Sequence, residues 1–409
     1  MSDAGNAAVA TEPAAPWGDA AFESVEAALR AAGPLAALER LAEHLDAAGD
    51  YRALLDALLL RARHELGLPL IAIGPLAELP EPVRTHYEEK YVDAIRQVGA
   101  KYLDAGDIPT AWAYYRAIGE TDPIAQAIRA YQPQDNDDRL GAVIEVAFQH
   151  GVNPRRGFEL ILEHYGTCAA ISAFEQLPPT DEAVRAAAAE RLIGRLHRDL
   201  AANLRSEIAA RGQELPPASA TIAELLHGRD WLFADDAYHI DISHLASVVR
   251  MALVVADPQV IALAVDLTEY GRRLAPRLQF EGPPPFERVF DDHRLYLRAL
   301  LGQDVQAAID HFRAKLGSPG AEPAENQKTI PAQTLVNLLV RLGRLEEAIG
   351  VASDWLAGLP DSALFCPGVA QLCQRAGNPQ RLAAVARDHG DLVNYTAARL
   401  VMVATPASS

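Results

Sequence analysis

The stretch YVDAIRQVGAKYLDAGDIPTAWAYYRAIGETDP, residues 91–123, reads as two helices joined by a tight turn. Apolar residues recur every three to four positions on both sides of Ala105-Gly106-Asp107, which is the period of an amphipathic helix. Glycine tolerates the left-handed conformation that ends many helices, and an aspartate after it can cap the next helix. The stretch therefore predicts a helical hairpin.

The same plan recurs along the chain, whereas signals for strands are nearly absent. Residues 34–50 and 51–67 repeat it, again with Ala-Gly-Asp between the two predicted helices. Asp257-Pro258 is expected to end a further helix, because proline disfavours the α conformation in the residue before it. That helix has one apolar stripe, made by Leu245, Val248, Val249, Ala252, Leu253 and Ala256.

Two segments resemble the tetratricopeptide repeat, a two-helix unit of 34 residues. In residues 92–123 the signature positions are Ile95, Val98, Gly99, Tyr102, Ala111, Tyr115, Ile118 and Pro123. In residues 329–360 they are Leu335, Leu339, Gly343, Ala348, Trp355 and Pro360, with departures at Val336 and Ala352. Gly343 and Gly377 also stand 34 residues apart.

This resemblance implies an all-α fold in which antiparallel helical hairpins stack as a tetratricopeptide-like α-solenoid. It places the small residues Gly99 and Ala111 where the paired helices touch, and Pro123 at the end of the second helix. Such arrays present a concave surface to protein or peptide partners. In the best-matched repeat, the residues of the first helix that we expect at this groove are Tyr87, Lys90, Tyr91 and Arg96.

Proline-rich and polar stretches suggest where the chain divides. The strongest linker candidate is GSPGAEPAENQKTIP, residues 317–331. The predicted regions are a disordered tail (1–18), hairpin repeats (19–131), an irregular central helical block (132–278), C-terminal helical repeats (279–402) and a flexible tail (403–409).

Composition narrows the classes of partner. The 409 residues carry a net charge of −18, which repels phosphate backbones and argues against nucleic acid. The most apolar segment, residues 251–267, is interrupted by Asp257, Pro258 and Asp266, so we expect no membrane span. Three cysteines are too few and too scattered for a disulfide framework, and the start of the chain lacks a basic signal. A reducing compartment, the cytoplasm, is the expected location.

Candidate metal ligands concentrate in the central block. His164 and Cys168 are four residues apart in one predicted helix that begins after Asn153-Pro154, so we expect them on one face. His239, Asp241 and His244 form the pattern H-x-D-x-x-H. Imidazole, thiolate and carboxylate are the usual ligands of zinc and related divalent metals.

If the two segments meet, the histidines and the cysteine supply four ligands, and Asp241 orients or replaces one of them. An open position on such a metal would support a metal-dependent hydrolase or lyase. The simpler alternative is that Asp241 caps a helix beginning near Ile242 and that Cys168 lies on a buried apolar stripe. No C-x-x-C or H-E-x-x-H motif accompanies these residues.

Arg155 and Arg156 lie in the first turn of a predicted helix, where positive charge is unfavourable for the helix dipole. They are candidates for binding an anion or an acidic partner. The sequence has no phosphate loop, dinucleotide fingerprint or serine-hydrolase elbow. The leading hypothesis is therefore a scaffold for a protein or peptide partner. The alternatives are the metal-dependent enzyme and a purely structural role in an assembly.

Overall fold

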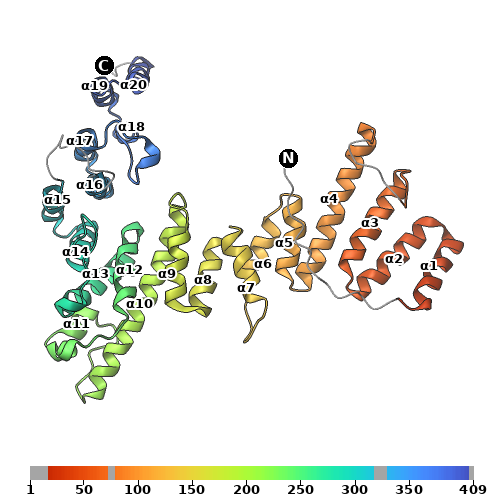
Figure 1. Cartoon of the computed structure of the whole chain (residues 1–409), viewed down its shortest axis with the longest axis horizontal. Helices are drawn as coiled ribbons and strands as arrows, with labels where there is room; N and C mark the ends of the chain where they lie inside the picture. Colours follow the sequence, from red (N-terminus) through yellow and green to blue (C-terminus); the bar gives the residue numbers. More distant parts are fainter. Residues whose placement is uncertain (1–16, 72–78, 317–328, 405–409) are drawn as a thin grey trace. The chain divides into compact units, whose positions relative to one another are not determined.

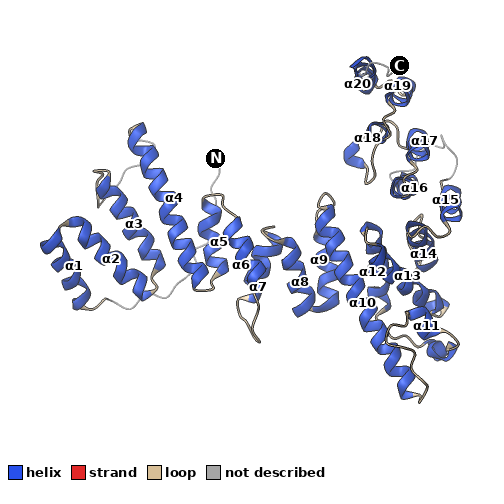
Figure 2. Ribbon diagram, turned by 180° about the vertical axis from the view of Figure 1, so that it is seen from behind, coloured by secondary structure: helices blue, strands red, loops and turns tan. Residues whose placement is uncertain are grey.

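The computed structural model describes residues 17–71, 79–316 and 329–404. The chain divides into two compact units, Met1–Gly157 (unit 1) and Phe158–Ser409 (unit 2). Over the described residues the secondary structure is helical, with no β-strand and only one isolated bridge, between Glu281 and Arg288 (Figure 2). The prediction of an all-α fold is confirmed at this level.

Unit 1 is a row of helices in which neighbours in sequence are neighbours in space (Figure 1). Each consecutive pair from α1 to α6 packs side by side. A π-helical turn, Glu145–Gln149, directly follows α7. The helices are α1 (Asp19–Ala32), α2 (Pro34–Ala48), α3 (Tyr51–Glu65), α4 (Glu81–Asp104), α5 (Ile108–Ala117), α6 (Asp122–Ala130) and α7 (Leu140–Ile144).

The two predicted Ala-Gly-Asp turns form as expected. Gly49 and Gly106 have φ angles of 72° and 73°, which glycine adopts without strain. Asp50 then accepts a hydrogen bond from the Ala53 backbone N–H at 3.0 Å, and so caps α3. Asp107 caps α5 in the same way, through Thr110 N–H at 3.1 Å.

Small residues lie where α4 meets α5. A Cβ added to Gly99 would come within 2.7 Å of the Tyr115 ring, so only glycine lets the helices approach this closely. Ala111 is fully buried in the same hairpin. Pro123 does not end the second helix as predicted: α5 already ends at Ala117, and the proline lies in the first turn of α6. Proline suits a first helical turn because its missing N–H has no partner there.

Unit 2 begins at Phe158, inside α8 (Pro154–His164). Short 3₁₀ turns at Asp230–Asp236, Ala252–Val254, Pro276–Leu278 and Asp361–Ala363 separate some of its helices. The helices are α9 (Gly166–Gln176), α10 (Glu182–Ala210), α11 (Ile222–Leu226), α12 (Ile242–Met251), α13 (Pro258–Arg273), α14 (Val289–Leu300), α15 (Val305–Ala314), α16 (Thr329–Arg341), α17 (Leu345–Trp355), α18 (Val369–Arg375), α19 (Pro379–Asp388) and α20 (Leu392–Ala404).

Two kinds of packing occur within unit 2. The long helix α10 contacts α9, α11, α12 and α13, which makes a small bundle around it. From α13 to α20 each helix packs mainly on the next one in sequence. Residues 329–360, the second matched repeat, coincide with the hairpin of α16 and α17. Gly343 and Gly377 both follow a helix with positive φ angles, 74° and 63°.

Three predicted boundaries are corrected. Residues 329–331 of the linker candidate belong to α16, whereas 317–328 lie outside the described residues. α20 extends to Ala404, past the predicted start of the terminal tail at 403; residues 1–16 and 405–409 also lie outside the description. α12 ends at Met251 instead of Asp257, because residues 252–254 tighten into a 3₁₀ turn that leaves Ala256 exposed.

Over the residues described, no helix combines the length and the hydropathy needed to cross a bilayer.

Candidate functional site

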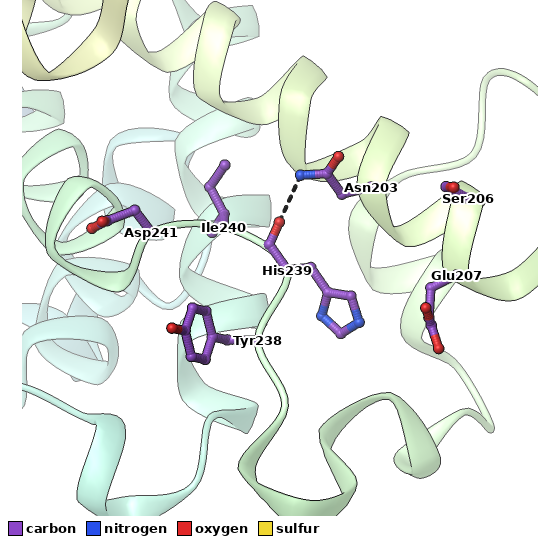
Figure 3. A pocket seen from close by; sticks show the side chains of 7 residues that line it. All are labelled: Asn203, Ser206, Glu207, Tyr238, His239, Ile240 and Asp241. Atoms are coloured by element: carbon purple, nitrogen blue, oxygen red, sulfur yellow. Dashed lines mark hydrogen bonds between the residues drawn. The ribbon is translucent and has the colours of Figure 1, made fainter.

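A cleft of about 500 Å³ opens in unit 2, between the C-terminal half of α10 and the segment that leads into α12 (Figure 3). Its walls come from two stretches of chain that are about 30 residues apart in sequence. The lining residues are Asn203, Ser206, Glu207, Tyr238, His239, Ile240 and Asp241.

The polar wall follows from the periodicity of α10. Asn203, Ser206 and Glu207 have the spacing i, i+3, i+4, which places them on one face of a helix. An apolar row at four-residue spacing runs along the same helix and carries the packing of the bundle. Its members, each at most 1% exposed, are Leu192, Leu196, Leu200, Leu204 and Ile208.

His239 is held in the cleft by three hydrogen bonds. Its backbone carbonyl accepts from Asn203 Nδ2 at 2.7 Å, as Figure 3 shows. Its backbone N–H donates to the Tyr270 hydroxyl at 2.7 Å, and its ring Nδ1 lies 3.1 Å from the same oxygen. The Tyr270 hydroxyl can both accept the backbone N–H and donate its own proton, so it contacts the backbone and the ring of His239 at once.

Burial sets the charge state of this pair. It lowers the pKa of His239, with the charge of Glu207 acting in the opposite direction. It raises the pKa of Tyr270 to about 12, against the effect of the His239 N–H. Both side chains are thus neutral near pH 7. The ring of Phe233 packs against both, 5.3 Å from the Tyr270 ring centre and 6.3 Å from that of His239.

Asp241 caps α12. Its Oδ1 accepts the backbone N–H groups of Ser243 and His244 at 2.8 and 3.0 Å, and the Ser243 hydroxyl at 2.6 Å. The Ser243 hydroxyl is the main cause that lowers the pKa of this carboxyl, followed by the His244 N–H. Asp241 is therefore ionised at neutral pH. The cap itself is the one that the alternative from the sequence predicted.

Glu207 contributes the second carboxylate of the cleft. Its Oε1 lies 3.6 Å from Nε of Arg211, and both side chains are about half exposed. Arg211 also lies over the ring of Trp231, 4.3 Å from its centre, so it is held outside the lining. No lysine or arginine lines the cleft itself. The site thus presents carboxylate, amide, hydroxyl and phenol groups, a set suited to accepting hydrogen bonds from a cation.

The helix predicted to join His164 and Cys168 is interrupted between them. α8 ends at His164, and α9 begins at Gly166, whose φ of 80° breaks the helical path. The two side chains therefore belong to different helices, so the i, i+4 argument fails. Cys168 is exposed, which corrects the expectation of a buried stripe. Tyr165, which lies between the two helices, is exposed as well.

The predicted metal-ligand set is not assembled. Within the described ranges, which include His164, Cys168, His239, Asp241 and His244, no three His, Cys, Asp or Glu side chains lie where they could hold one metal ion. The physical reasons are the break at Gly166 and the competing bonds of His239 with Tyr270 and of Asp241 with the start of α12. His239 and Asp241 both line the cleft, from the same segment of chain.

Arg155 and Arg156 lie in the first turn of α8, as predicted. The Arg156 backbone N–H donates to the side chain of Asn153 at 3.3 Å, which makes Asn153 the expected cap. The Arg156 guanidinium donates to the carbonyl of Tyr131 at 3.2 Å. This bond ties the start of α8 to the end of α6. The Arg155 side chain is exposed.

The four groove candidates on α4 differ in exposure and in their partners. Tyr87 is only 3% exposed, which corrects its assignment to a binding surface. Lys90 and Arg96 are surface residues that pair with Glu65 at 2.7 Å and Glu120 at 2.6 Å. Tyr91, at 37% exposed, is the one large apolar ring of the four that reaches solvent.

Sequence reasoning missed Asn203, Glu207 and Tyr270. The first two carried only a weak signal, a polar pair at i and i+4, because polar residues such as Arg195 and Asp199 lie along this helix as well. Tyr270 carried none, because nothing local links it to a backbone group 31 residues earlier.

A scan against models of known protein families, a search of curated proteins and a search of solved structures each returned no match for this chain.

Proposed function

We propose that this chain is a tetratricopeptide-like scaffold that binds a protein partner, and that the cleft in unit 2 receives a lysine or arginine side chain of that partner. The observation that carries the proposal is the lining of the cleft, which has two carboxylates, from Glu207 and Asp241, and no basic side chain. A cationic group entering it gains charge-assisted hydrogen bonds.

The ionisation of the cleft favours this ligand class. Asp241 keeps its charge because the Ser243 hydroxyl and the backbone N–H of His244 stabilise the carboxylate. His239 is neutral, since burial lowers its pKa, and so it adds no positive charge to repel the ligand. The net charge of −18 also attracts basic partners from a distance at low ionic strength.

The scaffold part of the proposal rests on the hairpins. Small residues at the α4–α5 contact and the coincidence of residues 329–360 with α16 and α17 are both typical of tetratricopeptide units. The cysteines in the described residues, Cys168, Cys366 and Cys373, are free thiols, and we propose a reducing compartment such as the cytoplasm.

The unit 2 cleft is a better binding site than the α4 surface. Lys90 and Arg96 already have acidic partners within the chain, and Tyr87 is buried. A partner at that surface would first have to break those ion pairs. In the cleft, by contrast, the approach of a cation meets only a loose 3.6 Å contact between Glu207 and Arg211.

The test uses a fluorescein-labelled lysine-rich peptide and its fully acetylated copy, with binding followed by anisotropy. We expect the unmodified peptide to bind and Glu207→Gln to weaken it about fivefold, the loss of one exposed charge-assisted contact of about 1 kcal/mol. Glu190→Gln on the same helix is the matched control, because it removes an equal charge outside the cleft. Equal weakening by both variants would mean that the peptide senses only net charge, and the cleft would be rejected as the site.

A further inference from the structure

The last described helix, α20, carries an exposed apolar face. Among its residues Leu392, Val393, Leu400 and Val403 are 74%, 79%, 65% and 79% exposed. No other described helix exposes as many large apolar side chains. An exposed apolar face of this kind ordinarily marks a site of interaction.

The exposed residues form one continuous stripe. Ala398 is buried against the rest of unit 2, with Asn394, Tyr395 and Met402 half-buried beside it, and α19 packs on α20. The opposite side follows the spacing i, i+3, i+4, i+7 and i+10, which is a single helix face. Its members are Val393, Thr396, Ala397, Leu400 and Val403, all exposed.

We propose that this face binds the same face of a second copy of the chain, with the two α20 helices antiparallel across a two-fold axis between Thr396 and Ala397. In that register Val393 lies opposite Leu400 of the other copy, and Leu400 lies opposite its Val393. The small residues fall at the crossing point, where two helix backbones must approach most closely. Large side chains thus lie at both ends of the contact and small ones at its centre. This pattern reads the same from either copy, as a two-fold interface requires.

The α20 face is a place where the repulsion between two copies is small. Two chains with a net charge of −18 repel each other over most of their surfaces. From Leu392 to Ala404 there is no acidic residue, and Arg399, at the flank of the stripe, is the only charge. An antiparallel arrangement also sets the helix dipoles in opposite directions, which is attractive.

The size of the face predicts a weak dimer. A helix of 13 residues is about 20 Å long, so the pair buries less than a standard interface of about 1,600 Å². Complexes of this size have dissociation constants at the micromolar end of the range or above. A reversible, concentration-dependent dimer is therefore expected.

Sedimentation velocity of the full chain tests this, at protein concentrations from about 5 to 500 μM, which bracket the affinity of a small interface. The wild type is expected to shift from monomer to dimer, and Leu400→Glu to raise the dissociation constant at least about tenfold, since it buries a charge against Val393. Ala384→Glu adds the same charge on the exposed side of α19 and should dimerise like the wild type. Circular dichroism confirms that each variant is folded.

A second measurement fixes the register. In a Cys168→Ser background, Thr396→Cys should be joined to its copy by a short bismaleimide, because the two-fold axis passes beside it. Ala384→Cys in the same background should stay monomeric under this reagent. A wild type that is monomeric up to 500 μM, equal dimerisation of Leu400→Glu and Ala384→Glu, or equal crosslinking at both cysteine positions would each overturn the proposal.

Discussion

At the scale of single residues, His293 is the most strongly perturbed imidazole that the structure describes. It is buried in α14, where its Nδ1 donates to the Val289 carbonyl at 2.6 Å and its ring stacks on Phe286 at 4.1 Å between centres. Burial lowers its pKa to about 4, although the nearby charge of Asp292 acts in the opposite direction. The folded protein therefore holds this ring neutral.

This perturbation predicts an acid-dependent loss of stability. Between about pH 6.5 and 4 the unfolded chain binds a proton at His293 and the folded chain does not, so the free energy of unfolding falls as the pH is lowered. From pH 7 to 5 the loss is about 2 kcal/mol. Urea unfolding should show His293→Phe to be less sensitive to pH than the wild type by this amount.

The matched control for that experiment is His389→Phe, which changes an exposed imidazole. If His293→Phe and the wild type lose the same free energy between pH 7 and 5, the buried ring does not remain neutral and the interpretation is wrong.

At the scale of elements, two glycines in helices have different surroundings: one lies against a neighbouring helix and the other faces open space. Gly271 on α13 lies against the ring of Phe290 on α14, so closely that an added methyl group would overlap the ring. Phe290 is itself buried and has no space to retreat. Gly194, inside α10, has open space where its Cβ would be.

Alanine at the two positions should therefore act in opposite directions. Gly271→Ala is expected to destabilise the protein by about 1–3 kcal/mol through overpacking. Gly194→Ala is expected to stabilise it by about 0.5–1 kcal/mol, because alanine loses less conformational entropy in a helix. Chemical denaturation of both variants measures the difference. Two shifts of the same sign would contradict the packing of α13 on α14.

The start of α12 gives a further prediction. Asp241→Ala removes the acceptor of three hydrogen bonds and should cost about 1 kcal/mol of stability at pH 7. Because the pKa of Asp241 is lowered in the folded state, its contribution is present above about pH 3.9 and disappears as the pH falls through the folded value. Asp241→Asn keeps a capping acceptor and should lose only a few tenths. Thermal unfolding at pH 7 that ranks the asparagine variant below the alanine one would exclude the capping role.

Local chemistry explains which elements could be predicted. Gly49-Asp50 and Gly106-Asp107 each hold their turn and cap within four residues, so the sequence pattern alone located both hairpins. Gly166 was missed for the opposite reason. The apolar residues keep their helical spacing on both sides of Gly166. A pattern of hydrophobic residues does not reveal that a single residue has a positive φ.

The site was harder to predict than the fold because its contacts are not local. The cap by Asp241 spans three residues and was expected from the sequence. The bonds that place His239 come from Asn203, 36 residues earlier, and Tyr270, 31 residues later. An H-x-D-x-x-H pattern suggests a metal ligand set, but tertiary contacts give its members different partners.

At the scale of the whole molecule, each unit contains a core cluster of its own. Unit 1 contains a cluster made by Leu45, Leu54, Ala57 and Val98. Unit 2 contains a larger cluster, which includes Phe312, Leu335, Leu339 and Ile349 from α15, α16 and α17. These clusters share no residue. In arrays of helices each helix is stabilised mainly by its neighbours. A destabilising substitution should therefore affect the helices that it contacts and their neighbours most.

Matched leucine truncations should therefore affect different parts of the chain. Leu54→Ala and Leu339→Ala both remove a buried side chain and should each cost about 2–5 kcal/mol locally. Hydrogen exchange followed by mass spectrometry should show faster exchange in α2, α3 and α4 for the first variant and in α15, α16 and α17 for the second. In each case the helices around the other core should keep wild-type protection. Uniform acceleration through both units by either variant would show that the chain unfolds as one cooperative body, and the separate cores would then have no energetic independence.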